Sequence, residues 1–578
     1  MFKEFKWFIK SYKKNLIIGV IFLLLSDIVG IFPPYIIGDL TDKVFENSID
    51  LDRFIKLIAI LIGVIIIKYF FAMGWSFFIH RGGNEIELRL RSMLMSKFLD
   101  QSMEFFDENS TGSLMGKSTN DINSVSGMIG FGTLAMFDAT AYPFFIILVM
   151  IFSVSLKLTL ATIIPIPLLA VLVKLLGDKI YKKWDKAQAA FDKLNSFVLE
   201  DVVGIRIINV FNLQNVRRRM FKVRGEELKE KNLEVAKYNA LFRPIDLTIT
   251  AISFGIAIFY GAVLIYRGEI TIGKLVSFTF YLNMLIWPMF ALGNFINIKN
   301  QATASMNRIQ KVLDYEEDIV DRKDAITHIE KPDIEFKDFS FKYPDSDYIL
   351  KDINLKIPYG SSLGILGKTG SGKSTLLKQL LKYYKTDFSK ILVNDKYLDD
   401  YTTYAIRDKL SYVPQKHMIF SKTIEENIKL SKPDATDEEL NKAIEMADFK
   451  KDLENLPMGL QTLCGERGVS LSGGQKQRIG IARAFLKDPD ILLLDDCMSA
   501  VDGKTERNII NNINSRNHQG TIILACHRIS QVMNMDHIIV LEDGKIVEEG
   551  SHQELMELDG WYATQFVRQM AGGRYSEE

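Results

Sequence analysis

GKTGSGKS, residues 367–374, is the stretch of this sequence that determines its fold most directly. It fits the phosphate-binding loop pattern G-x-x-x-x-G-K-[ST], between an apolar strand-like run ending at Leu366 and a helical pattern from about Ser374. Glycines let successive backbone N–H groups turn toward phosphate oxygens, a lysine supplies positive charge, and a serine hydroxyl binds Mg²⁺. The sequence therefore predicts a site for ATP and Mg²⁺ at Gly367, Thr369, Gly370, Ser371, Gly372, Lys373, Ser374 and Thr375.

Short apolar runs on both sides of this loop alternate with helical patterns. The runs are IEFKDFSF, SSLGILG, KLSYVPQ, ILLLDD, TIILACH and HIIVLEDGKIV. Such alternation predicts an α/β domain with a largely parallel sheet. Within the fourth run, the strand expected from Ile491 ends at Asp495, the position where folds of this type hold the metal ion through water. We therefore expect Asp495 to join Ser374 at the Mg²⁺.

Composition separates this C-terminal half from the half that precedes it. The chain has 578 residues, of which 48% are hydrophobic and 25% charged, and its 71 basic and 71 acidic residues cancel. The balance gives no indication of a nucleic-acid partner, but the front half is apolar and the back half is not. The three cysteines, Cys464, Cys497 and Cys526, lie in the back half. Their spacing predicts neither a disulfide nor a zinc site and fits a reducing cytosol.

The front half contains six apolar runs, each near the ~20 residues that a helix needs to cross a bilayer. The first begins at Leu16 and continues past Asp27 to Pro33 and Pro34. The other five lie at roughly 55–79, 132–154, 157–178, 245–266 and 273–298. The sequence thus predicts an all-α transmembrane domain of six spans at residues 1–315, a linker at 316–332, the α/β domain at 333–570 and a short tail at 571–578.

Positive charge predicts how the spans are oriented. The lysine-rich N-terminus, the stretch after His80 and Arg81, and residues 217–219 are expected in the cytosol, together with the nucleotide domain and both chain ends. The opposite side is expected to hold the loop with Asp42, Glu46, Asp50 and Asp52. Residues 80–131 and 179–244 then become long cytoplasmic excursions, and their helical periodicity indicates that they extend the spans.

A second motif lies between the phosphate loop and Asp495. It is Leu471-Ser472-Gly473-Gly474-Gln475, followed by Arg478, and it resembles the signature of the ATP-binding cassette, the mark of ABC proteins. A phosphate loop occurs in many ATPases, whereas the two motifs in this order are typical of that family, and the resemblance covers nearly the whole chain. It implies a dimer in which each ATP lies between one chain's phosphate loop and the other chain's signature. The residues expected at the partner's nucleotide are Ser472, Gly473, Gly474 and Gln475.

The resemblance also implies roles for other residues of the nucleotide domain. Tyr343 matches the aromatic residue that stacks on adenine, and Gln415 matches the glutamine that contacts Mg²⁺ and the membrane domain. His527 matches the histidine that senses the γ-phosphate, and residues 499–502 match the D-loop. Taken singly, these residues also fit ordinary positions: a surface aromatic, a turn residue and a histidine at the end of a strand.

Two segments of the front half resemble the cytoplasmic coupling loops of ABC exporters. One holds Phe105-Phe106-Asp107 with Thr111-Gly112 and Asn120-Asp121, and the other is Gly204-Ile205-Arg206-Ile207-Ile208 after Glu200. The resemblance implies short transverse helices that contact the nucleotide domains. A membrane domain fused ahead of the ATPase, and Gly465-Glu466-Arg467-Gly468 just before the signature, resemble exporters rather than importers.

One residue departs from the family pattern. Active ABC ATPases have glutamate directly after the strand-end aspartate, because that carboxylate orients the water that attacks the γ-phosphate; here the residue is Asp496. Its carboxylate is retracted by one C–C bond, ~1.5 Å, and a misplacement of about 1 Å can cost on the order of 100-fold in rate. We expect this chain's own site, with Asp495, Asp496, His527 and Gln415 as its catalytic residues, to bind ATP well and hydrolyse it poorly.

An impaired carboxylate beside an intact signature implies a partner chain of different sequence. The chain resembles the degenerate subunit of bacterial heterodimeric multidrug exporters; a homodimer with slow hydrolysis at both sites is the alternative. The resemblance implies ATP-driven export of hydrophobic, multidrug-type substrates across the cell membrane by alternating access. A lipid exporter, a peptide exporter and an ATP-gated channel or sensor are the other possibilities. Inside the spans, Asp27, Lys68 and Asp138 fit either a site for cationic substrates or internal pairing.

Overall fold

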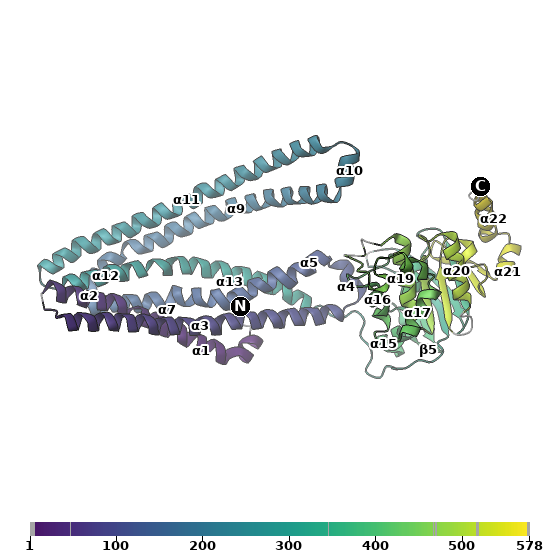
Figure 1. Ribbon diagram of the computed structural model, residues 1–578, viewed down its shortest axis with the longest axis horizontal. Helices are drawn as coiled ribbons and strands as arrows, with labels where there is room; N and C mark the ends of the chain where they lie inside the picture. The colour runs from purple at the N-terminus through teal and green to yellow at the C-terminus, as the bar shows by residue number, and fades with distance from the viewer. Residues whose placement is uncertain are drawn as a thin grey trace. The chain divides into compact units, whose positions relative to one another are not determined.

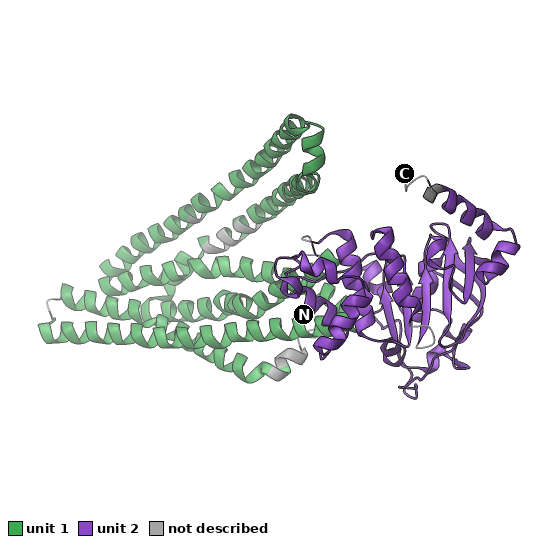
Figure 2. Ribbon diagram, turned by 45° about the vertical axis from the view of Figure 1, so that its right-hand side comes forward, with its two compact units in different colours: residues 1–99, 111–315 green, residues 100–110, 316–578 purple. Residues whose placement is uncertain are grey.

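The computed structural model describes residues 6–46, 48–344, 346–465, 468, 471–515 and 520–574. The chain folds into two compact units (Figure 2): residues 1–99 with 111–315 form a helical unit, and residues 100–110 with 316–578 form an α/β unit. An all-α unit followed along the chain by an α/β unit confirms the predicted fold class.

The helical unit consists of long helices and short connecting ones (Figure 1). They are α1 (Lys6–Gly30), α2 (Phe32–Phe45), α3 (Leu51–Leu99), α5 (Thr111–Gly116), η1 (Lys117–Asp121), α6 (Ile122–Gly127), η2 (Met128–Gly132), α7 (Thr133–Val149), η3 (Met150–Val154), α8 (Leu156–Ile163), α9 (Pro165–Val203), α10 (Ile205–Val210), α11 (Gln214–Tyr266), α12 (Ile272–Met284) and α13 (Ile286–Leu313). Within the described residues, five helical stretches are long and apolar enough to cross a membrane: Tyr12–Phe45, Leu51–Leu99, Thr111–Val154, Gln214–Tyr266 and Ile272–Leu313. They contain five of the six predicted spans. The remaining one, at 157–178, follows α8 and the start of α9, where several side chains lie outside the described part of the chain.

The first span continues further than the sequence predicts. Pro33 and Pro34 lie in the first turn of α2, where proline is tolerated because the N–H groups of that turn have no partner within the helix. The prediction that Asp42 lies in a loop is therefore wrong, since Asp42 lies inside α2, whereas Glu46 and Asp50 lie between α2 and α3. The Asp42 carboxylate accepts hydrogen bonds from the Thr271 hydroxyl (2.5 Å) and the Gly273 N–H (2.6 Å), and so caps the start of α12.

The two predicted excursions are helical extensions of the spans, as predicted, and they are interrupted at 100–102 and 109–110 in the first and at 204 and 211–213 in the second. α3 has 49 residues and α11 has 53. At ~1.5 Å per residue each is more than ~70 Å long, over twice the ~30 Å apolar thickness of a bilayer. α9 and α11 pack against each other, are joined by α10, and diverge toward α10 from the other helices of the unit (Figure 1).

The α/β unit contains two sheets. Their strand orders are β2-β1-β4-β5, which is antiparallel, and β10-β9-β3-β8-β7-β6, which is parallel except for β10. The strands are β1 (Ile334–Lys342), β2 (Tyr348–Ile357), β3 (Ser362–Gly367), β4 (Ile391–Val393), β5 (Lys396–Tyr397), β6 (Leu410–Val413), β7 (Ile491–Asp495), β8 (Thr521–Ala525), β9 (His537–Glu542) and β10 (Lys545–Gly550). The largely parallel sheet is as predicted, whereas the antiparallel sheet is not among the predictions.

Helices surround these sheets (Figure 1). They are α14 (Lys373–Leu380), α15 (Thr403–Lys409), α16 (Ile424–Ile428), α17 (Asp437–Met446), α18 (Lys450–Glu454), α19 (Gly473–Leu486), α20 (Gly503–Asn514), α21 (His552–Glu557) and α22 (Trp561–Arg574). The adjacent strands β3, β8 and β7 are fully buried, as expected of parallel strands covered on both faces. Because they are parallel, their carboxyl ends lie at one edge of the sheet, and this edge carries the phosphate loop and Asp495.

A short helix from the first excursion belongs to the α/β unit. It is α4 (Met103–Glu108), whose Phe105 side chain is 1% exposed. The Met103 N–H donates to the Tyr383 carbonyl (3.2 Å), and the Tyr384 hydroxyl donates to Asp107 (2.8 Å). This segment, which resembles a coupling loop, is thus packed against the nucleotide domain of its own chain.

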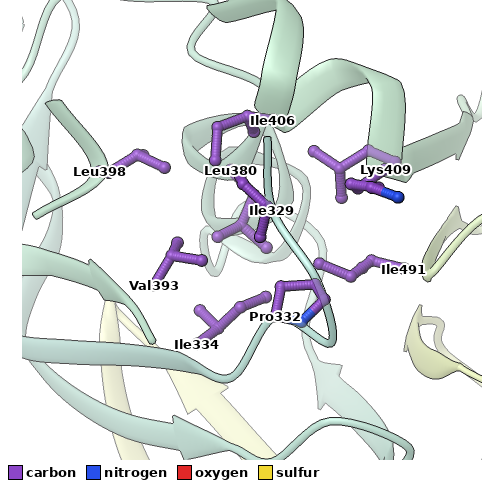
Figure 3. A pocket seen from close by; sticks show the side chains of 10 residues that line it. Ile329, Pro332, Ile334, Leu380, Val393, Leu398, Ile406, Lys409 and Ile491 are labelled. Carbon is purple, nitrogen blue, oxygen red and sulfur yellow. The ribbon is translucent and has the colours of Figure 1, made fainter. Parts of the chain in front are cut away.

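Residues 316–332 also pack on the α/β unit. The Asp321 carboxylate accepts hydrogen bonds from the Thr403 N–H (2.9 Å) and hydroxyl (2.7 Å) at the start of α15. Further along, Ile329 and Pro332 line a small apolar pocket (Figure 3). The pocket has about 10 Å³ of room for a water molecule, close to the least that one water needs. It is therefore a packing feature and too small for a nucleotide.

Candidate nucleotide-binding site and polar residues in the spans

The phosphate loop connects β3 to α14 and depends on glycine. Gly367, Gly370 and Gly372 have φ angles of +149°, +86° and +105°, a region that residues with a Cβ seldom adopt. A Cβ on Gly367 would also lie 2.3 Å from the carbonyl oxygen of Leu541. Thr369 is exposed at the tip of the loop. The loop leads into the N-terminus of α14, and such an N-terminus presents free N–H groups and the positive end of the helix dipole to an anion.

Lys373, the first residue of α14, reaches back across the loop. Its ammonium donates to the carbonyls of Gly367 (2.8 Å) and Lys368 (2.9 Å), and the residue is 7% exposed. Burial lowers the pKa of Lys373, so an anion beside it would stabilise its charged form. The Ser371 hydroxyl is buried and has no hydrogen-bond partner among the described residues. A phosphate oxygen would give the Ser371 hydroxyl its acceptor and the Lys373 ammonium a further one, so the loop fits the phosphates of ATP.

Asp495, at the end of β7, is the centre of the candidate metal site and is 4% exposed. Its Oδ1 accepts a hydrogen bond from the Ser374 hydroxyl (2.7 Å), and its Oδ2 accepts one from the Tyr412 hydroxyl (3.1 Å). The structure thus brings together Ser374 and Asp495, two of the oxygen donors predicted for Mg²⁺. Mg²⁺ in nucleotide sites takes one or two protein oxygens and completes its shell with water and substrate phosphates, so these residues fit the ion.

Asp496 follows at the same sheet edge. It has a φ of +44°, in the left-handed region that aspartate visits more readily than most residues. Its N–H donates to the Ala525 carbonyl of β8 (2.8 Å), and its Oδ2 accepts from the Gln415 side-chain amide (3.2 Å). Three of the predicted catalytic residues, Gln415, Asp495 and Asp496, therefore lie together.

Two other predicted residues lie beside this group. The Tyr343 hydroxyl is 3.2 Å from the Thr375 hydroxyl of α14. The ring centroids of Tyr343 and Tyr384 are 4.9 Å apart, at an interplanar angle of 86°. His527 lies two residues beyond β8, and its backbone carbonyl accepts from the Gln569 amide (3.0 Å). Its imidazole makes no hydrogen bond within the part of the chain that the structure describes.

The signature segment forms the exposed N-terminus of α19. The Gln475 N–H donates to the Ser472 hydroxyl (3.3 Å), and the Ser472 N–H donates to the Gln475 side chain (2.9 Å). This capping box holds the first turn. The Gln475 and Arg478 side chains also donate to Asp452 of α18 (3.3 and 3.0 Å). Within the described residues, no hydrogen bond joins Ser472 or Gln475 to the phosphate loop, so the structure does not place the signature at this chain's own nucleotide.

The D-loop is attached to the signature helix. The Gln477 amide of α19 donates to the Ser499 hydroxyl (3.2 Å), and its carbonyl oxygen accepts from the Ala500 N–H (3.0 Å). A Cβ on Gly474 would lie 3.0 Å from the Ala500 carbonyl oxygen, so glycine allows the two segments to approach closely. In the exporter-type loop before the signature, Glu466 and Arg467 lie outside the described residues.

Tyr412 is the residue at this site that the sequence motifs do not single out. It lies three positions before Gln415 in the run KLSYVPQ, where it reads as one more strand residue. One signal could have identified Tyr412: its side chain carries a hydroxyl group in a largely apolar strand, and that strand leads into a predicted metal-site residue. The signal is weak, because only the pairing of β6 with β7 brings it near Asp495.

The three polar residues of the spans have different surroundings. Asp138 of α7 is 7% exposed and accepts a hydrogen bond from the Trp287 indole of α13 (2.6 Å). One carboxylate oxygen of Asp27 is buried with no hydrogen-bond partner among the described residues. The Lys68 side chain covers Gly30, where a Cβ would lie 3.1 Å from its ammonium. No ion pair joins Asp27 to Lys68 in the described helices, so the direct pairing considered as an alternative is not formed.

An open apolar pocket of about 300 Å³ lies on the helical unit, and some of its lining side chains are exposed, such as Tyr35 at 55% and Phe32 at 51%. It is lined by Ile28, Ile31, Phe32, Tyr35, Phe145, Leu148, Val149, Ser153 and Tyr281. The Tyr281 hydroxyl donates to the Ile31 carbonyl (3.1 Å), which leaves mainly hydrocarbon and aromatic surface facing the pocket. A pocket of this kind favours an apolar or aromatic ligand.

Comparisons with known proteins agree with this arrangement. The family profile “ABC transporter transmembrane region” matches residues 16–289, and the profile “ABC transporter” matches residues 350–499. The “Probable multidrug resistance ABC transporter ATP-binding/permease protein YheI” of Bacillus subtilis (strain 168) is 41% identical over 568 residues, which cover 98% of this chain and 97% of that protein. The “Multidrug resistance-like ATP-binding protein MdlA” of Escherichia coli (strain K12) is 32% identical over 97% of this chain and 95% of that protein. A solved structure of a bacterial Atm1-family ABC exporter with ATP bound has the same fold, with a TM-score of 0.78 and 22% identity over 96% of this chain and 98% of that chain.

Proposed function

The chain belongs to the ABC transporter family, and from this premise we propose that it is one half of a dimeric multidrug-type exporter in the cell membrane. The observation that carries the proposal is the combination, in one chain, of spanning helices with a site in which Ser374 and Asp495 are in contact (2.7 Å). ATP hydrolysis is thereby joined to a membrane domain. The proposed orientation places the nucleotide domain and both chain ends in the cytosol, in accordance with the positive charge of the predicted cytoplasmic segments.

The exposed signature and the second coupling segment support a dimer. Gly473 at the N-terminus of α19 is exposed, and this N-terminus presents the positive end of the helix dipole. Apolar side chains are also exposed on and around α10: Val203 is 81% exposed, Ile207 61% and Val210 76%. Exposed apolar side chains gathered on one short segment outside the membrane are typical of a surface that binds a protein partner. A second nucleotide domain would cover it.

We propose further that the partner is a different chain. The proposal of a different partner rests on Asp496, whose short carboxylate cannot reach the position of a glutamate carboxylate. The signature of the same chain is intact, since Ser472 and Gln475 keep its capped geometry. The partner would then carry the glutamate, and its ATP would be hydrolysed against this chain's signature. This chain's own site would chiefly bind nucleotide and hold the dimer closed.

In the proposed site each residue has a defined part. Lys373 and the N-terminus of α14 would hold the phosphates, and Ser374 and Asp495 would hold Mg²⁺, whose charge offsets that of the phosphates. Tyr343 would stack on the adenine, and Gln415 and His527 would contact the metal side and the γ-phosphate. Closure of the dimer around ATP would be passed to the spans through α4, which is hydrogen-bonded to Tyr384.

The substrate class follows from the membrane half and from the relatives. The open 300 Å³ pocket on the apolar helices favours hydrophobic aromatic compounds, and the relatives named above are described as multidrug resistance proteins. A buried carboxylate such as Asp138 would favour a positive charge on the substrate. An amphipathic organic cation is therefore the compound with which to test transport.

Inside-out membrane vesicles that contain the chain with its native partner provide the test. We expect accumulation of a fluorescent cationic dye against its gradient when ATP is present, and none with ADP or with Lys373→Ala. Vesicles with Lys545→Ala should behave as wild type, because Lys545 is an exposed lysine whose neighbour is the surface residue Asp352 (3.6 Å). Dye movement only down its gradient would instead identify an ATP-gated channel and would contradict the export function.

A further inference from the structure

Tyr412 shares a face of the sheet with Asp495. It pairs with Leu493 in the parallel register of β6 and β7. Side chains on one face of a strand recur at every second residue, so Tyr412 lies on the same side as Leu493 and as Asp495, two residues further. The tyrosine is long enough to reach along the sheet, and its hydroxyl donates to Asp495 Oδ2 at 3.1 Å.

The Tyr412 hydroxyl acts here as a donor. Burial, followed by the charge of Asp495, raises the pKa of Tyr412, so the phenol keeps its proton at neutral pH. An ionised carboxylate can only accept hydrogen bonds. The contact therefore fixes the orientation of the Asp495 carboxylate, and a hydrogen bond to a charged group is stronger than one between neutral groups.

The two oxygens of Asp495 have partners of different kinds. Oδ1 is bonded to Ser374, which belongs to the phosphate loop and is itself a proposed Mg²⁺ donor. Oδ2 is bonded to Tyr412, which belongs to β6 and has no part in the loop. If Ser374 bound Mg²⁺ instead of Asp495, Tyr412 could keep its hydrogen bond to the carboxylate. Tyr412 would then hold one oxygen of Asp495 while the other remained available to the metal side.

The ring of Tyr412 contacts a residue that holds α4. The rings of Tyr412 and Tyr383 lie 6.5 Å apart between centroids, at an interplanar angle of 84°. The Tyr383 carbonyl accepts the Met103 N–H at the start of α4 (3.2 Å), and the next residue, Tyr384, donates to Asp107 near its end (2.8 Å). All of these contacts lie within the α/β unit. One side chain thus touches both the metal-site carboxylate and a residue bonded to α4.

We propose that Tyr412 is a positioning residue with two parts: its hydroxyl holds Asp495 for the Mg²⁺ that accompanies ATP, and its ring links that carboxylate, through Tyr383, to α4. The inference deepens the proposed function, because it rests on ATP and Mg²⁺ binding at this site. Packing alone would explain a buried aromatic residue at position 412, but a phenylalanine would pack as well. The hydroxyl bonded to Asp495 is what packing does not require.

The hydroxyl is tested by metal binding to the full-length chain in lipid nanodiscs, with Mn²⁺ in place of Mg²⁺ and free Mn²⁺ measured by electron paramagnetic resonance. In saturating ATP, Tyr412→Phe should weaken the apparent Mn²⁺ affinity about tenfold, the effect of losing one hydrogen bond to a charged group. Its affinity for ATP in EDTA should be unchanged. The matched control is Tyr404→Phe, the same chemical change at a side chain that is 76% exposed, and it should alter neither affinity.

Two results would overturn this part of the inference. One is a Tyr412→Phe chain that binds Mn²⁺ as tightly as wild type. The other is a chain whose affinity for ATP in EDTA falls as much as its Mn²⁺ affinity, which would indicate a general structural role. A wild-type chain that binds no ATP with or without metal would refute the proposed function itself, and the EDTA titration separates that failure from a failure at Tyr412.

The ring is tested by hydrogen exchange of residues 100–110, whose amides include the Met103 N–H. Wild type and Tyr412→Phe should both show slower exchange of this segment when saturating ATP and Mg²⁺ are added. Tyr412→Leu, which lacks the ring, should lose that response while it keeps its affinity for ATP in EDTA. If Tyr412→Leu does not fold, Tyr383→Leu serves instead. An ATP response as large in the leucine variant as in the phenylalanine variant would show that the ring does not link the two sites.

Discussion

The phosphate loop and the signature are both glycine-rich segments that lead into a helix, and they differ in where their polar groups point. The phosphate loop is bonded inward: Lys373 is 7% exposed and donates to the loop, and Ser374 donates to Asp495. The signature is exposed and bonded to itself through Ser472 and Gln475. The first segment is thus completed by this chain. The second is a capped helix N-terminus without a phosphate loop of its own, and in the proposed dimer another chain would complete it.

The two segments also differ in how fully they keep the family pattern. Asp496 shortens the carboxylate beside the phosphate loop, whereas the signature retains each residue of its motif. Substitutions in the two segments should therefore affect the ATPase of the assembled dimer in an unexpected order. The larger losses of ATPase activity are expected for substitutions in the signature, although the signature does not contact the nucleotide bound to this chain's own phosphate loop.

Ser472→Ala should cause the largest effect. We expect the steady-state ATPase of the complex with its native partner to fall about 100-fold, the size of effect seen when one donor is removed from a charge-stabilising shell. The same change also removes an N-cap, which costs about 1 kcal/mol of stability. Ser551→Ala is the matched control, because Ser551 forms the same capping box at the start of α21, away from any nucleotide site. If Ser551→Ala lowers the ATPase as much as Ser472→Ala, the loss is one of folding and the assignment of the signature is wrong.

Lys373→Ala should have an intermediate effect. The ammonium lost is a charge-assisted donor to phosphate, and we expect ATP affinity at this chain's site to weaken about tenfold or more. The ATPase of the complex should fall by a similar factor at limiting ATP and recover in part at high ATP, because closure rather than chemistry is impaired. A loss of turnover that high ATP does not relieve would mean that Lys373 serves the main hydrolytic site.

Asp138→Asn changes a residue of the spanning helix α7, outside both the phosphate loop and the signature. It tests the proposed substrate site rather than either nucleotide segment. Asparagine keeps an oxygen that can accept the Trp287 N–H (2.6 Å in the native residue), so the change removes mainly the charge. Transport of a cationic dye should fall about fivefold, the equivalent of ~1 kcal/mol for one weakened charge pair, while transport of a neutral substrate and basal ATPase stay near wild type. Trp287→Phe, which removes the donor and leaves the charge, is the control. Equal loss for cationic and neutral substrates would identify Asp138 as structural.

Sequence reasoning predicts best what short segments determine by themselves. The phosphate loop with the helix that follows it, and the strand that ends at Asp495, need only local backbone shapes, and the structure contains each of them. Apolar length alone likewise indicates the spanning helices. Where glycine, proline and strand-length apolar runs set the local structure, the pattern in the sequence was sufficient.

Contacts between distant segments could not be predicted in this way. Asp42 looks like a loop residue until α2 is packed beside α12, where it caps Gly273 (2.6 Å). Tyr412 reaches Asp495 only because β6 lies next to β7 in a particular register. The antiparallel sheet was not predicted because the apolar run of β1 does not reveal its antiparallel partners, β2 and β4. Its strand β5 has two residues, and both are exposed, so it has no apolar pattern to detect.

Asp496→Asn should have the smallest effect and is the most direct measurement of the central claim that this chain's own site contributes little hydrolysis. If the short carboxylate already slows that site about 100-fold, removing its charge leaves the sum of the two sites nearly unchanged. The measurement is the steady-state ATPase of the complex with Asp496→Asn, beside Ser472→Ala, each assembled with the wild-type partner. We predict that Asp496→Asn keeps most of the activity while Ser472→Ala loses most of it. A complex in which Asp496→Asn abolishes turnover and Ser472→Ala spares it would contradict the account, because this chain would then carry the active carboxylate.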